Sequence, residues 1–466
     1  MCGIIGSRGR VITRDAVERI LYRGRDGFGV NERVCDSFDP SLLPAQGVVH
    51  LLHAMVGKVC QPFEGSFVTN CEIYNWEELK EKYDVPGEND AQVFYELLKK
   101  KGIHIVDEID GDFAFIWNTP DALIFGRDRL GVKPLCYSLN DDGILVASEL
   151  KCLDNSDRKE FCEPGVVYAY DTQLVKKKDK TALIAKKEDV AQALLDAIKK
   201  RVDGLTKVGI LFSGGVDSTL LAKVCKDLGK QVHLYTAGFC DGNLEEARDV
   251  IWAKKAASTL GIPLCVINAD FEETESAIKE IIPVIESDDI VKVGVALPFY
   301  FCAKKAHEDG VRVLLSGIGA EECFAGYERH LKVLESGGDV NEECRRGFEE
   351  IWKRDLYRDD VITMYHSVEL RVPFLDENLV RISLGIPQEE KISRDQKKII
   401  LRKIAAELGV PKEVCERKKL GAQYGSKFDR AIEKLAKRQG MQKQEFLRKI
   451  SASLSKKELS GMSNQC

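Results

Sequence analysis

One stretch decides the fold of most of this 466-residue chain: Lys207-Val-Gly-Ile-Leu-Phe-Ser213-Gly214-Gly215-Val216-Asp217-Ser218-Thr219. Its apolar start predicts a buried strand over 207–212, and the Ser-Gly-Gly turn leads directly into a predicted helix over 219–228. Glycines let the backbone approach an anion closely, and a helix N-terminus directs free N–H groups at it. The spacing is not that of a Walker A loop, so the stretch predicts a phosphate-binding loop of another kind.

The residues after this loop alternate between strand and helix patterns. Strands are predicted at 231–239, 264–269 and 311–315, with a helix at 244–260. Strands that alternate with helices form a parallel sheet covered on both faces. We therefore expect a doubly wound parallel sheet in this part of the chain.

The first 170 residues have a different pattern, rich in short strands. Five runs bounded by turn residues predict strands, at 47–56, 65–68, 113–118, 123–126 and 144–147. The clearest helix is at 90–101, where Val93, Phe94, Leu97 and Leu98 share one face. We expect a first domain at 2–170, a lysine-rich linker at 171–189, a second domain at 190–436 and a polar, fraying tail at 437–466.

Composition narrows the class of protein. The net charge of −6 gives no reason to expect a nucleic-acid partner, and no apolar run reaches the roughly 18 residues of a membrane span. The N-terminus reaches Arg8 too early for a secretory signal, so we expect a cytoplasmic protein without a membrane partner. The 15 cysteines include no C-x-x-C pair, which excludes a zinc ribbon or a thioredoxin-like motif.

Cys2 is a candidate nucleophile. A small second residue followed by Gly3 permits removal of Met1, which would leave a thiol beside a free α-amine. An α-amine with a pKa near 8 can act as the base for that thiol. A cysteine at position 2 can also occur by chance, so this position alone is weak evidence.

The residues around Cys2 and beyond resemble the class II glutamine amidotransferase domain. The motifs that carry the resemblance are Cys2-Gly-Ile-Ile-Gly6, Arg23-Gly-Arg-Asp-Gly27, Asn70-Cys-Glu-Ile-Tyr-Asn75, Gly126-Arg-Asp-Arg-Leu-Gly-Val-Lys-Pro-Leu135 and Ala147-Ser-Glu-Leu-Lys151. The resemblance covers residues 2–170 and implies an Ntn-hydrolase αββα sandwich that hydrolyses glutamine.

This resemblance also implies roles for single residues. Cys2 is the nucleophile, and the Asn70 side chain and the Cys71 backbone N–H form an oxyanion hole. Asp90 pairs with the α-ammonium group of glutamine, although Asp90 can also be read as an N-cap of its helix. The arginine that the family uses to bind the glutamine carboxylate is replaced by Met55, so Arg23, Arg25 or Lys58 supplies the charge, or glutamine binds weakly.

The second half resembles the ATP pyrophosphatase domain of asparagine synthetases, with the adenine nucleotide alpha hydrolase-like fold. The Ser213–Ser218 loop, the loop Val313–Tyr327 and the motif Glu369–Asp376 carry this resemblance. It implies binding of ATP and pyrophosphate by Leu211, Ser213, Gly214, Gly215, Asp217, Ser218, Ser316, Gly317 and Lys398. Asp217 and Glu321 are the implied Mg²⁺ ligands.

The whole chain thus resembles the glutamine-hydrolysing asparagine synthetase family, and its Gly-Ile-Gly turn is closer to the archaeal-type, domain-containing subgroup. The resemblance implies substrates aspartate, ATP and glutamine, a β-aspartyl-AMP intermediate, and pairing as a homodimer. Ile318 replaces a glutamate and Gly294 an arginine that the family has near the acyl substrate. These departures leave two alternatives open: a related ligase that adenylates another carboxylate, and a non-catalytic member of the family.

Overall fold

The computed structural model describes residues 2–54, 57–154, 157–179, 181, 183–242, 245–418 and 420–462. Two compact units are present. Unit 1 contains residues 1–187, 348–360 and 375–385, and unit 2 contains residues 188–347, 361–374 and 386–466. Met55 lies outside the described residues, so the predicted effect of its replacement stays a prediction.

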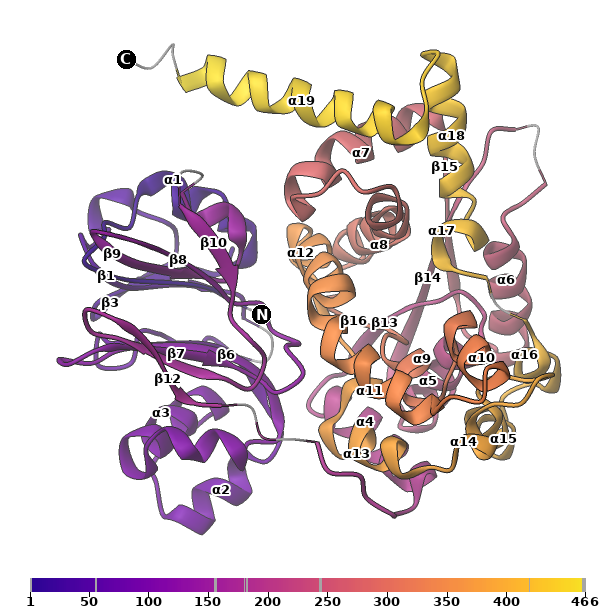
Figure 1. Ribbon diagram of the computed structural model, residues 1–466, viewed down its shortest axis with the longest axis horizontal. Coiled ribbons are helices and arrows are strands. Elements are labelled where there is room, and N and C mark those ends of the chain that lie inside the picture. Colours follow the sequence, from indigo (N-terminus) through magenta and orange to yellow (C-terminus); the bar gives the residue numbers. More distant parts are fainter. Residues whose placement is uncertain are drawn as a thin grey trace. The chain divides into compact units, whose positions relative to one another are not determined.

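Unit 1 is built on two stacked antiparallel sheets (Figure 1). The first has the strand order β10-β8-β9-β1-β4-β2-β3 and the second β12-β11-β7-β6-β5. The strands of the first sheet are β1 (Gly3–Arg8), β2 (Gly27–Val30), β3 (Arg33–Cys35), β4 (Gly47–Leu52), β8 (Cys136–Asn140), β9 (Gly143–Ala147) and β10 (Arg158–Phe161). Those of the second are β5 (Phe67–Ile73), β6 (Gly111–Asn118), β7 (Leu123–Arg127), β11 (Val167–Tyr170) and β12 (Leu174–Lys178).

Neighbouring residues of one strand enter different cores of the sandwich. Ile4 of β1 lies in the core between the sheets, whereas Ile5 packs on the outer face with Val17 of helix α1 (Arg14–Glu18). Such alternation follows from the two-residue period of a strand whose faces are both covered. The outer face of the second sheet is covered by α2 (Trp76–Tyr83) and α3 (Asp90–Lys101). The αββα sandwich is therefore confirmed.

Unit 2 contains a sheet of five parallel strands in the order β15-β14-β13-β16-β17. These are β13 (Lys207–Leu211), β14 (Gln231–Phe239), β15 (Leu264–Ala269), β16 (Val313–Leu315) and β17 (Glu369–Arg371). The chain adds β14 and β15 on one side of β13 and then β16 and β17 on the other. This order confirms a doubly wound sheet, in which ligands bind where the winding reverses, beyond the carboxyl ends of β13 and β16.

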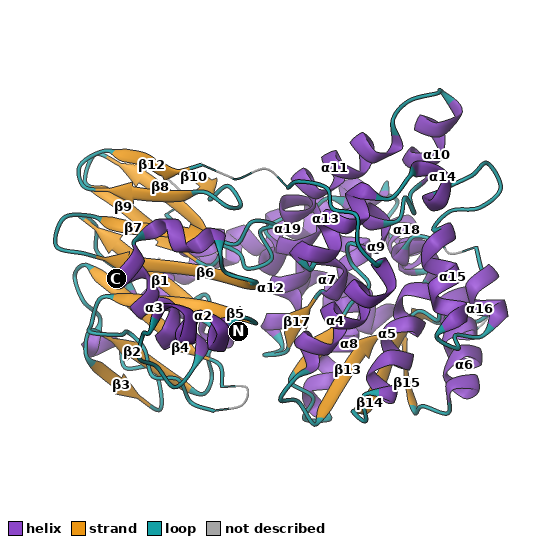
Figure 2. Cartoon of the chain, turned by 90° about the horizontal axis from the view of Figure 1, so that it is seen from below, coloured by secondary structure: helices purple, strands orange, loops and turns teal. Residues whose placement is uncertain are grey.

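Helices surround this sheet (Figure 2). Those of the first part are α4 (Val190–Val202), α5 (Val216–Asp227), α6 (Arg248–Leu260), α7 (Phe271–Ile285), α8 (Ile290–Glu308), α9 (Ala320–Cys323) and α10 (Glu328–Glu335). Those that follow are α11 (Val340–Ile351), α12 (Tyr357–Tyr365), α13 (Glu377–Gly385), α14 (Gln388–Lys391), α15 (Ile399–Glu407), α16 (Lys412–Glu416), α17 (Ala422–Gly425), α18 (Phe428–Arg438) and α19 (Lys443–Met462). By the division into units, α13 and the ends of α11 and α12 at 348–351 and 357–360 belong to unit 1.

Two segments differ from the prediction. Part of the predicted linker is the strand β12, which pairs with β11 at the edge of a sheet. The predicted fraying tail contains α19, where Phe446 and Leu447 are fully buried. In both segments a few apolar residues pack against the rest of the unit. Because charged residues surround them, the sequence pattern does not reveal the packed face.

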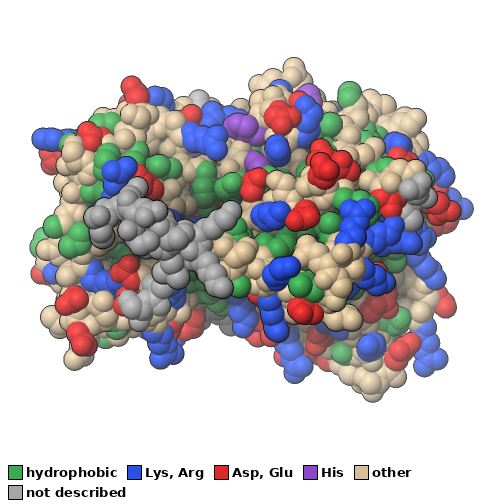
Figure 3. Space-filling model, turned by 90° about the horizontal axis from the view of Figure 1, so that it is seen from above, with side chains coloured by type: hydrophobic (Ala, Val, Ile, Leu, Met, Phe, Trp, Pro, Cys, Tyr) green, Lys and Arg blue, Asp and Glu red, His purple; other side chains and the backbone are tan. Residues whose placement is uncertain are grey.

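The described surface carries charges of both signs. On the face shown in Figure 3, lysine and arginine side chains are interspersed with aspartate and glutamate. Among the described residues, no helix is both long enough and apolar enough to cross a membrane.

Candidate active sites

Cys2 lies immediately before β1 and is linked to the second sheet of unit 1 through Asn70. The backbone N–H of Cys2 donates to Asn70 Oδ1 at 3.0 Å. This bond orients the amide of Asn70, whose Nδ2 group is buried and has no hydrogen-bond partner among the described residues. A buried N–H donor without a partner is costly unless a ligand accepts from it. The geometry therefore suits the role predicted for Asn70 as a donor to an oxyanion.

Asp90 lies beside Asn70 and Cys71. Its Oδ2 accepts the backbone N–H of Ile73 at 3.0 Å and lies 3.6 Å from the thiol of Cys71. Burial and the charge of Asp90 raise the pKa of Cys71 well above its usual range, so this thiol is protonated and can donate. The N-cap of α3 is Asn89, whose side chain accepts from the N–H of Gln92. The reading of Asp90 as the N-cap is therefore wrong.

Arg23 is placed differently from its predicted role. Its side chain is fully buried, and its guanidinium group contacts Glu149 at 2.6 Å and Asp360 at 2.8 Å. Because its two terminal nitrogens already contact two carboxylates, this guanidinium group is not placed to make a bidentate contact with the carboxylate of a substrate. The structure therefore argues against Arg23 as the group that binds the glutamine carboxylate. Asp360 was not predicted, because 337 residues separate it from Arg23.

The predicted phosphate loop of unit 2 joins β13 to α5. Gly214 has a positive φ of 66°, and a Cβ at this position would lie 2.5 Å from the backbone of Trp252. Glycine is therefore required both by the backbone conformation and by the lack of space for a side chain. The sequence predicted that the helix begins at Thr219, after Asp217 and Ser218. In the structure it begins at Val216, so both residues lie in its first turn.

A second loop, from Ser316 to Gly319, lies beside the first. It follows β16, which pairs with β13 through Gly209↔Leu314 and Ile210↔Leu315. A Cβ on Gly317 would lie 2.9 Å from the Cβ of Asp217, which shows how closely the two loops approach. The sheet thus brings together the Ser213–Ser218 and Ser316–Gly317 sets predicted from the sequence.

Lys398 connects these two loops. Its Nζ lies 2.6 Å from Asp217 Oδ1 and 3.0 Å from Glu321 Oε1. Burial lowers the pKa of Lys398, but the attraction of Asp217 and Glu321 outweighs it and raises the pKa above its usual value. Lys398 is therefore charged, and three residues named from separate motifs form one cluster.

Two arginines near this cluster were not predicted. Arg417 donates to the Ser213 carbonyl at 2.6 Å and to Asp249 at 2.5 Å, and its guanidinium lies over the ring of Trp252. Arg402 lies close enough to Asp217 to interact with its charge. Both come from the segment after Lys398. Arg402 ends the stretch Lys397-Lys-Ile-Ile-Leu-Arg402, but neither arginine was given a role from the sequence.

The donor set suits Mg²⁺ carried by phosphates. Magnesium is usually bound by one or two carboxylates, with substrate phosphates and water completing its shell. Asp217 and Glu321 supply two carboxylates around Lys398 Nζ. No group of three or more His, Cys, Asp or Glu that could hold a metal alone occurs in the part of the chain that the structure describes. Asp217 and Glu321 would hold Mg²⁺ together with the phosphates of ATP.

Two positions that depart from the family pattern have distinct surroundings. Ile318 lies in the second loop, and the neighbouring Glu322 is fully buried, 3.7 Å from Arg329. The carboxylate of Glu322, in α9, thus faces Arg329 of α10. At Gly294 a Cβ would lie 3.1 Å from the Cβ of Gln423, so a longer side chain there would displace Gln423.

Comparison with known proteins covers both halves of the chain. The model of the asparagine synthase family matches residues 189–337 and 332–459, and that of the glutamine amidotransferase domain matches residues 1–200. A predicted glutamine-hydrolyzing asparagine synthetase of Methanocaldococcus jannaschii is 32% identical, over 93% of this chain and 94% of its own length. Asparagine synthetase 2 of Lotus japonicus is 29% identical over 86% of this chain and 74% of its own.

A third relative, asparagine synthetase B of Escherichia coli, is 29% identical over 75% of this chain and 68% of its own length. All three relatives are named as glutamine-hydrolyzing enzymes. The matches follow the order of the two sites along the chain, with Cys2 in the first half and the Ser213–Ser218 loop in the second. The chain belongs to the family of glutamine-hydrolysing asparagine synthetases.

Proposed function

We propose that the chain makes asparagine from aspartate, using ATP and the amide nitrogen of glutamine. The observation that carries this proposal is the cluster of Asp217, Glu321 and Lys398 beside the Ser-Gly-Gly loop. A cation and two carboxylates at a helix N-terminus suit magnesium pyrophosphate as a leaving group. The identity of the substrates is inferred from the family to which the chain belongs.

The first half would release ammonia. The Cys2 thiolate attacks the side-chain carbonyl of glutamine, and Asn70 Nδ2 donates to the oxygen that becomes negative. The α-amine of Cys2, which takes the thiol proton, returns it to the leaving nitrogen. Collapse of this intermediate then expels ammonia and leaves a thioester, which water hydrolyses to glutamate. The Cys71 N–H and Asp90 are assigned to the oxyanion and to the glutamine α-ammonium by the same proposal.

The second half would activate aspartate. Its β-carboxylate attacks the α-phosphorus of ATP, the bond to pyrophosphate breaks, and ammonia then displaces AMP to form the amide. Mg²⁺ would neutralise charge on the phosphates, held by Asp217 and Glu321. Lys398 carries a permanent positive charge toward the leaving pyrophosphate, and Ser213, Ser218 and Ser316 offer hydroxyl donors.

A second candidate function keeps the adenylation and changes the carboxylate. Ile318 cannot move protons as a glutamate would, and Gln423 occupies the space beside Gly294. These two features favour a pocket that differs from that of the relatives. The use of Mg²⁺, a cytoplasmic location and assembly as a homodimer also remain proposals that rest on the family.

One experiment tests the two candidates together. Purified protein is incubated with ATP, Mg²⁺, ammonium and a panel of amino acids, and pyrophosphate is measured. We expect stimulation by aspartate and its loss in Asp217→Ala, with Asp227→Ala as the control because Asp227 is an exposed residue of the same helix, paired with Lys223. Stimulation by another carboxylate alone would favour the second candidate, and no stimulation would refute both.

The glutaminase is tested separately by glutamate release. Cys2→Ala should abolish it, whereas Cys60→Ala should not, because Cys60 is an exposed cysteine elsewhere in unit 1. Equal rates in wild type and Cys2→Ala would remove Cys2 from its role.

A further inference from the structure

Residues 348–360 lie within the part of the chain that matches the asparagine synthase model, yet they pack in unit 1. The Trp352 ring meets Phe161 edge to face at 5.6 Å and lies under the guanidinium of Arg127. The Tyr357 ring meets Phe161 at 4.9 Å, and its hydroxyl accepts the backbone N–H of Leu150 at 3.0 Å. This segment is therefore a structural part of the glutaminase.

The same segment contains a π-helical turn, Trp352–Leu356, between α11 and α12. Such turns are rare and often occur at functional sites, because the extra residue rotates the side chains that follow. Here it precedes the first residues of α12, which place Asp360 beside Arg23. The π-helical turn thus helps to set the direction of the Asp360 side chain.

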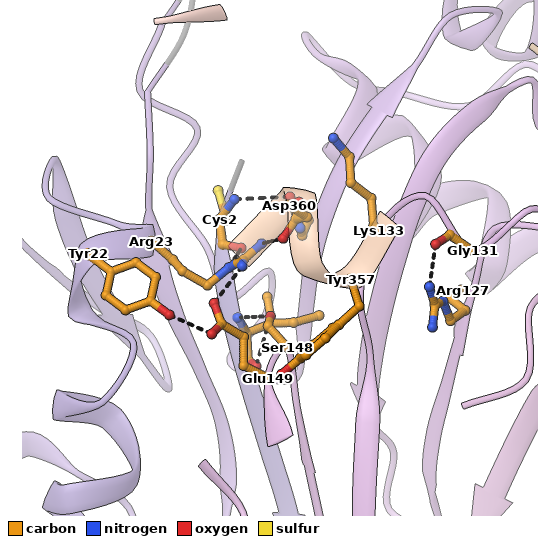
Figure 4. A network of polar contacts seen from close by, with 12 residues as sticks. Cys2, Tyr22, Arg23, Arg127, Gly131, Lys133, Ser148, Glu149, Tyr357 and Asp360 are labelled. Carbon is orange, nitrogen blue, oxygen red and sulfur yellow. Dashed lines mark hydrogen bonds and ion pairs between the residues drawn. The ribbon is translucent and has the colours of Figure 1, made fainter. Parts of the chain in front are cut away.

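Asp360 completes a buried charge network (Figure 4). Arg23 Nη1 donates to Glu149 at 2.6 Å and Nη2 to Asp360 at 2.8 Å. Tyr22 donates to the second oxygen of Glu149 at 2.5 Å, and Lys151 also contacts this oxygen. Arg23 and Glu149 have no exposed side-chain surface, and that of Asp360 is 4% exposed.

This network ends at the backbone of the nucleophile. Arg23 Nε lies 3.4 Å from the carbonyl oxygen of Cys2, and Asn70 accepts the N–H of Cys2 on its other side. The two contacts hold the backbone nitrogen and the carbonyl oxygen of Cys2, on either side of its side chain. The position of Arg23, in turn, depends on Glu149 and Asp360, which hold the two ends of its guanidinium.

A gain in folding stability alone does not explain why such a network is present. Burying an ion pair costs about as much as its attraction returns, so packed apolar residues would serve equally well. A forked, planar guanidinium group that is held at both ends does, however, fix the direction of the hydrogen bonds that it donates. Reaction geometry at a nucleophile depends on such fixed direction, because a displacement of about 1 Å can cost roughly 10²-fold in rate.

We propose that Asp360 is a positioning residue of the glutaminase, which orients Cys2 through Arg23. A residue from the second half of the chain is thus required for hydrolysis of glutamine, although it does not touch the substrate. This inference rests on the proposed function of Cys2. It also gives Arg23 a role in place of the predicted binding of substrate.

The test compares Asp360→Asn with Asp355→Asn in the full-length chain. The two changes are chemically equal and five residues apart, but Asp355 contacts Arg354 and Arg358 instead of Arg23. For Asp360→Asn we expect the kcat of glutamate release to fall at least about tenfold, with the KM for glutamine nearly unchanged. Asp355→Asn should keep the wild-type kcat, and Asp360→Glu should recover part of it.

Ammonium-dependent formation of pyrophosphate should be retained in Asp360→Asn and reports the folding of unit 2, whereas the midpoint of urea unfolding reports the folding of unit 1. An unchanged kcat in this variant would overturn the inference, and so would a rise in KM alone. An equal loss in both reactions, or in Asp355→Asn, would show a structural role and overturn it as well. Absence of glutaminase activity in the wild type would refute the proposed function of Cys2, and the inference with it.

Discussion

Lys398 shows what a single residue contributes to the second site. It has a left-handed backbone, with φ of 58°, immediately before α15, and its side chain passes over Gly326. A Cβ at Gly326 would lie 2.4 Å from the Cε of Lys398, so glycine there leaves the path open. The cluster with Asp217 therefore depends on one glycine and one unusual backbone conformation as well as on charge.

We predict that Lys398→Met abolishes pyrophosphate formation, with a loss of at least about 10²-fold, because the charge that meets the leaving group is removed. Glutamate release should continue, since Lys398 belongs to unit 2 and Cys2 to unit 1. Lys397→Met is the matched control, because the side chain of Lys397 forms an ion pair with Glu328 instead of joining the cluster of Asp217 and Glu321. A Lys398→Met variant with wild-type pyrophosphate formation would contradict the assignment.

The sequence could reveal residues whose chemistry lies in a contiguous motif. Ser213–Ser218 predicts an anion site by itself, since the glycines and the helix start are adjacent. Asp360 and Arg417 are different, because each acts on a partner more than 200 residues away. Arg23 was named, but its two carboxylate partners could not be read from its own motif, and these partners argue against the role predicted for it.

At the scale of elements, α10 depends on an unusual cap. The backbone N–H of Tyr327, the N-cap, donates to His330 Nδ1 at 3.2 Å. Only a neutral imidazole can accept this bond. Burial and the charges of Arg329 and Lys391 lower the pKa of His330 to about 3. The histidine thus takes the place that Glu or Gln has in a capping box.

This cap predicts a pH dependence of stability. An unfolded histidine binds a proton below about pH 6.5, whereas the folded one stays neutral down to about pH 3, so stability is lost as the pH falls through this window. At pH 5 the loss from His330 amounts to about 2 kcal/mol. His330→Gln keeps an acceptor without a titration, so the difference in urea unfolding between pH 7 and pH 5 should shrink by that amount.

His307→Gln is the control for this measurement, because His307 is exposed at the end of α8. It should not reproduce the effect of His330→Gln, because His307 is not part of this cap. If His330→Gln and His307→Gln behaved alike, the cap would not be the source of the acid sensitivity.

Element boundaries were predicted best where caps are local. Helix α3 has the predicted bounds because Asn89 begins it and Gly102 ends it. Helix α5 begins three residues earlier than predicted, at Val216, since the loop continues into a helical turn without a break. Strand β12 was missed because its lysines show no alternation, and only its pairing with β11 identifies it.

At the scale of the whole molecule, the two units interleave along the chain. Residues 348–360 and 375–385 leave the second half and pack with the first. Sequence patterns divide a chain into consecutive segments, so a division of this kind could not be predicted. The type of each fold could be predicted, because strand spacing and helix alternation are properties of consecutive residues.

We predict that a fragment of residues 1–190 is less stable than the same unit in the full chain. It lacks Asp360 beside the buried Arg23, and Phe161 loses the rings of Trp352 and Tyr357. Loss of one partner of a buried ion pair alone costs about 3 kcal/mol or more. Urea unfolding of fragment and full chain, followed by tryptophan fluorescence, measures the difference, and equal midpoints would contradict the prediction.

The distance along the chain between Arg23 and Asp360 has a consequence for synthesis on the ribosome. At roughly 5–20 residues per second, the 337 residues between them take about 20 to 70 seconds to translate. Under the proposed role of Asp360, a nascent chain carries Cys2 throughout this time but lacks the carboxylate that holds Arg23. Its hydrolysis of glutamine should therefore stay slower than that of the finished chain until residue 360 has been made.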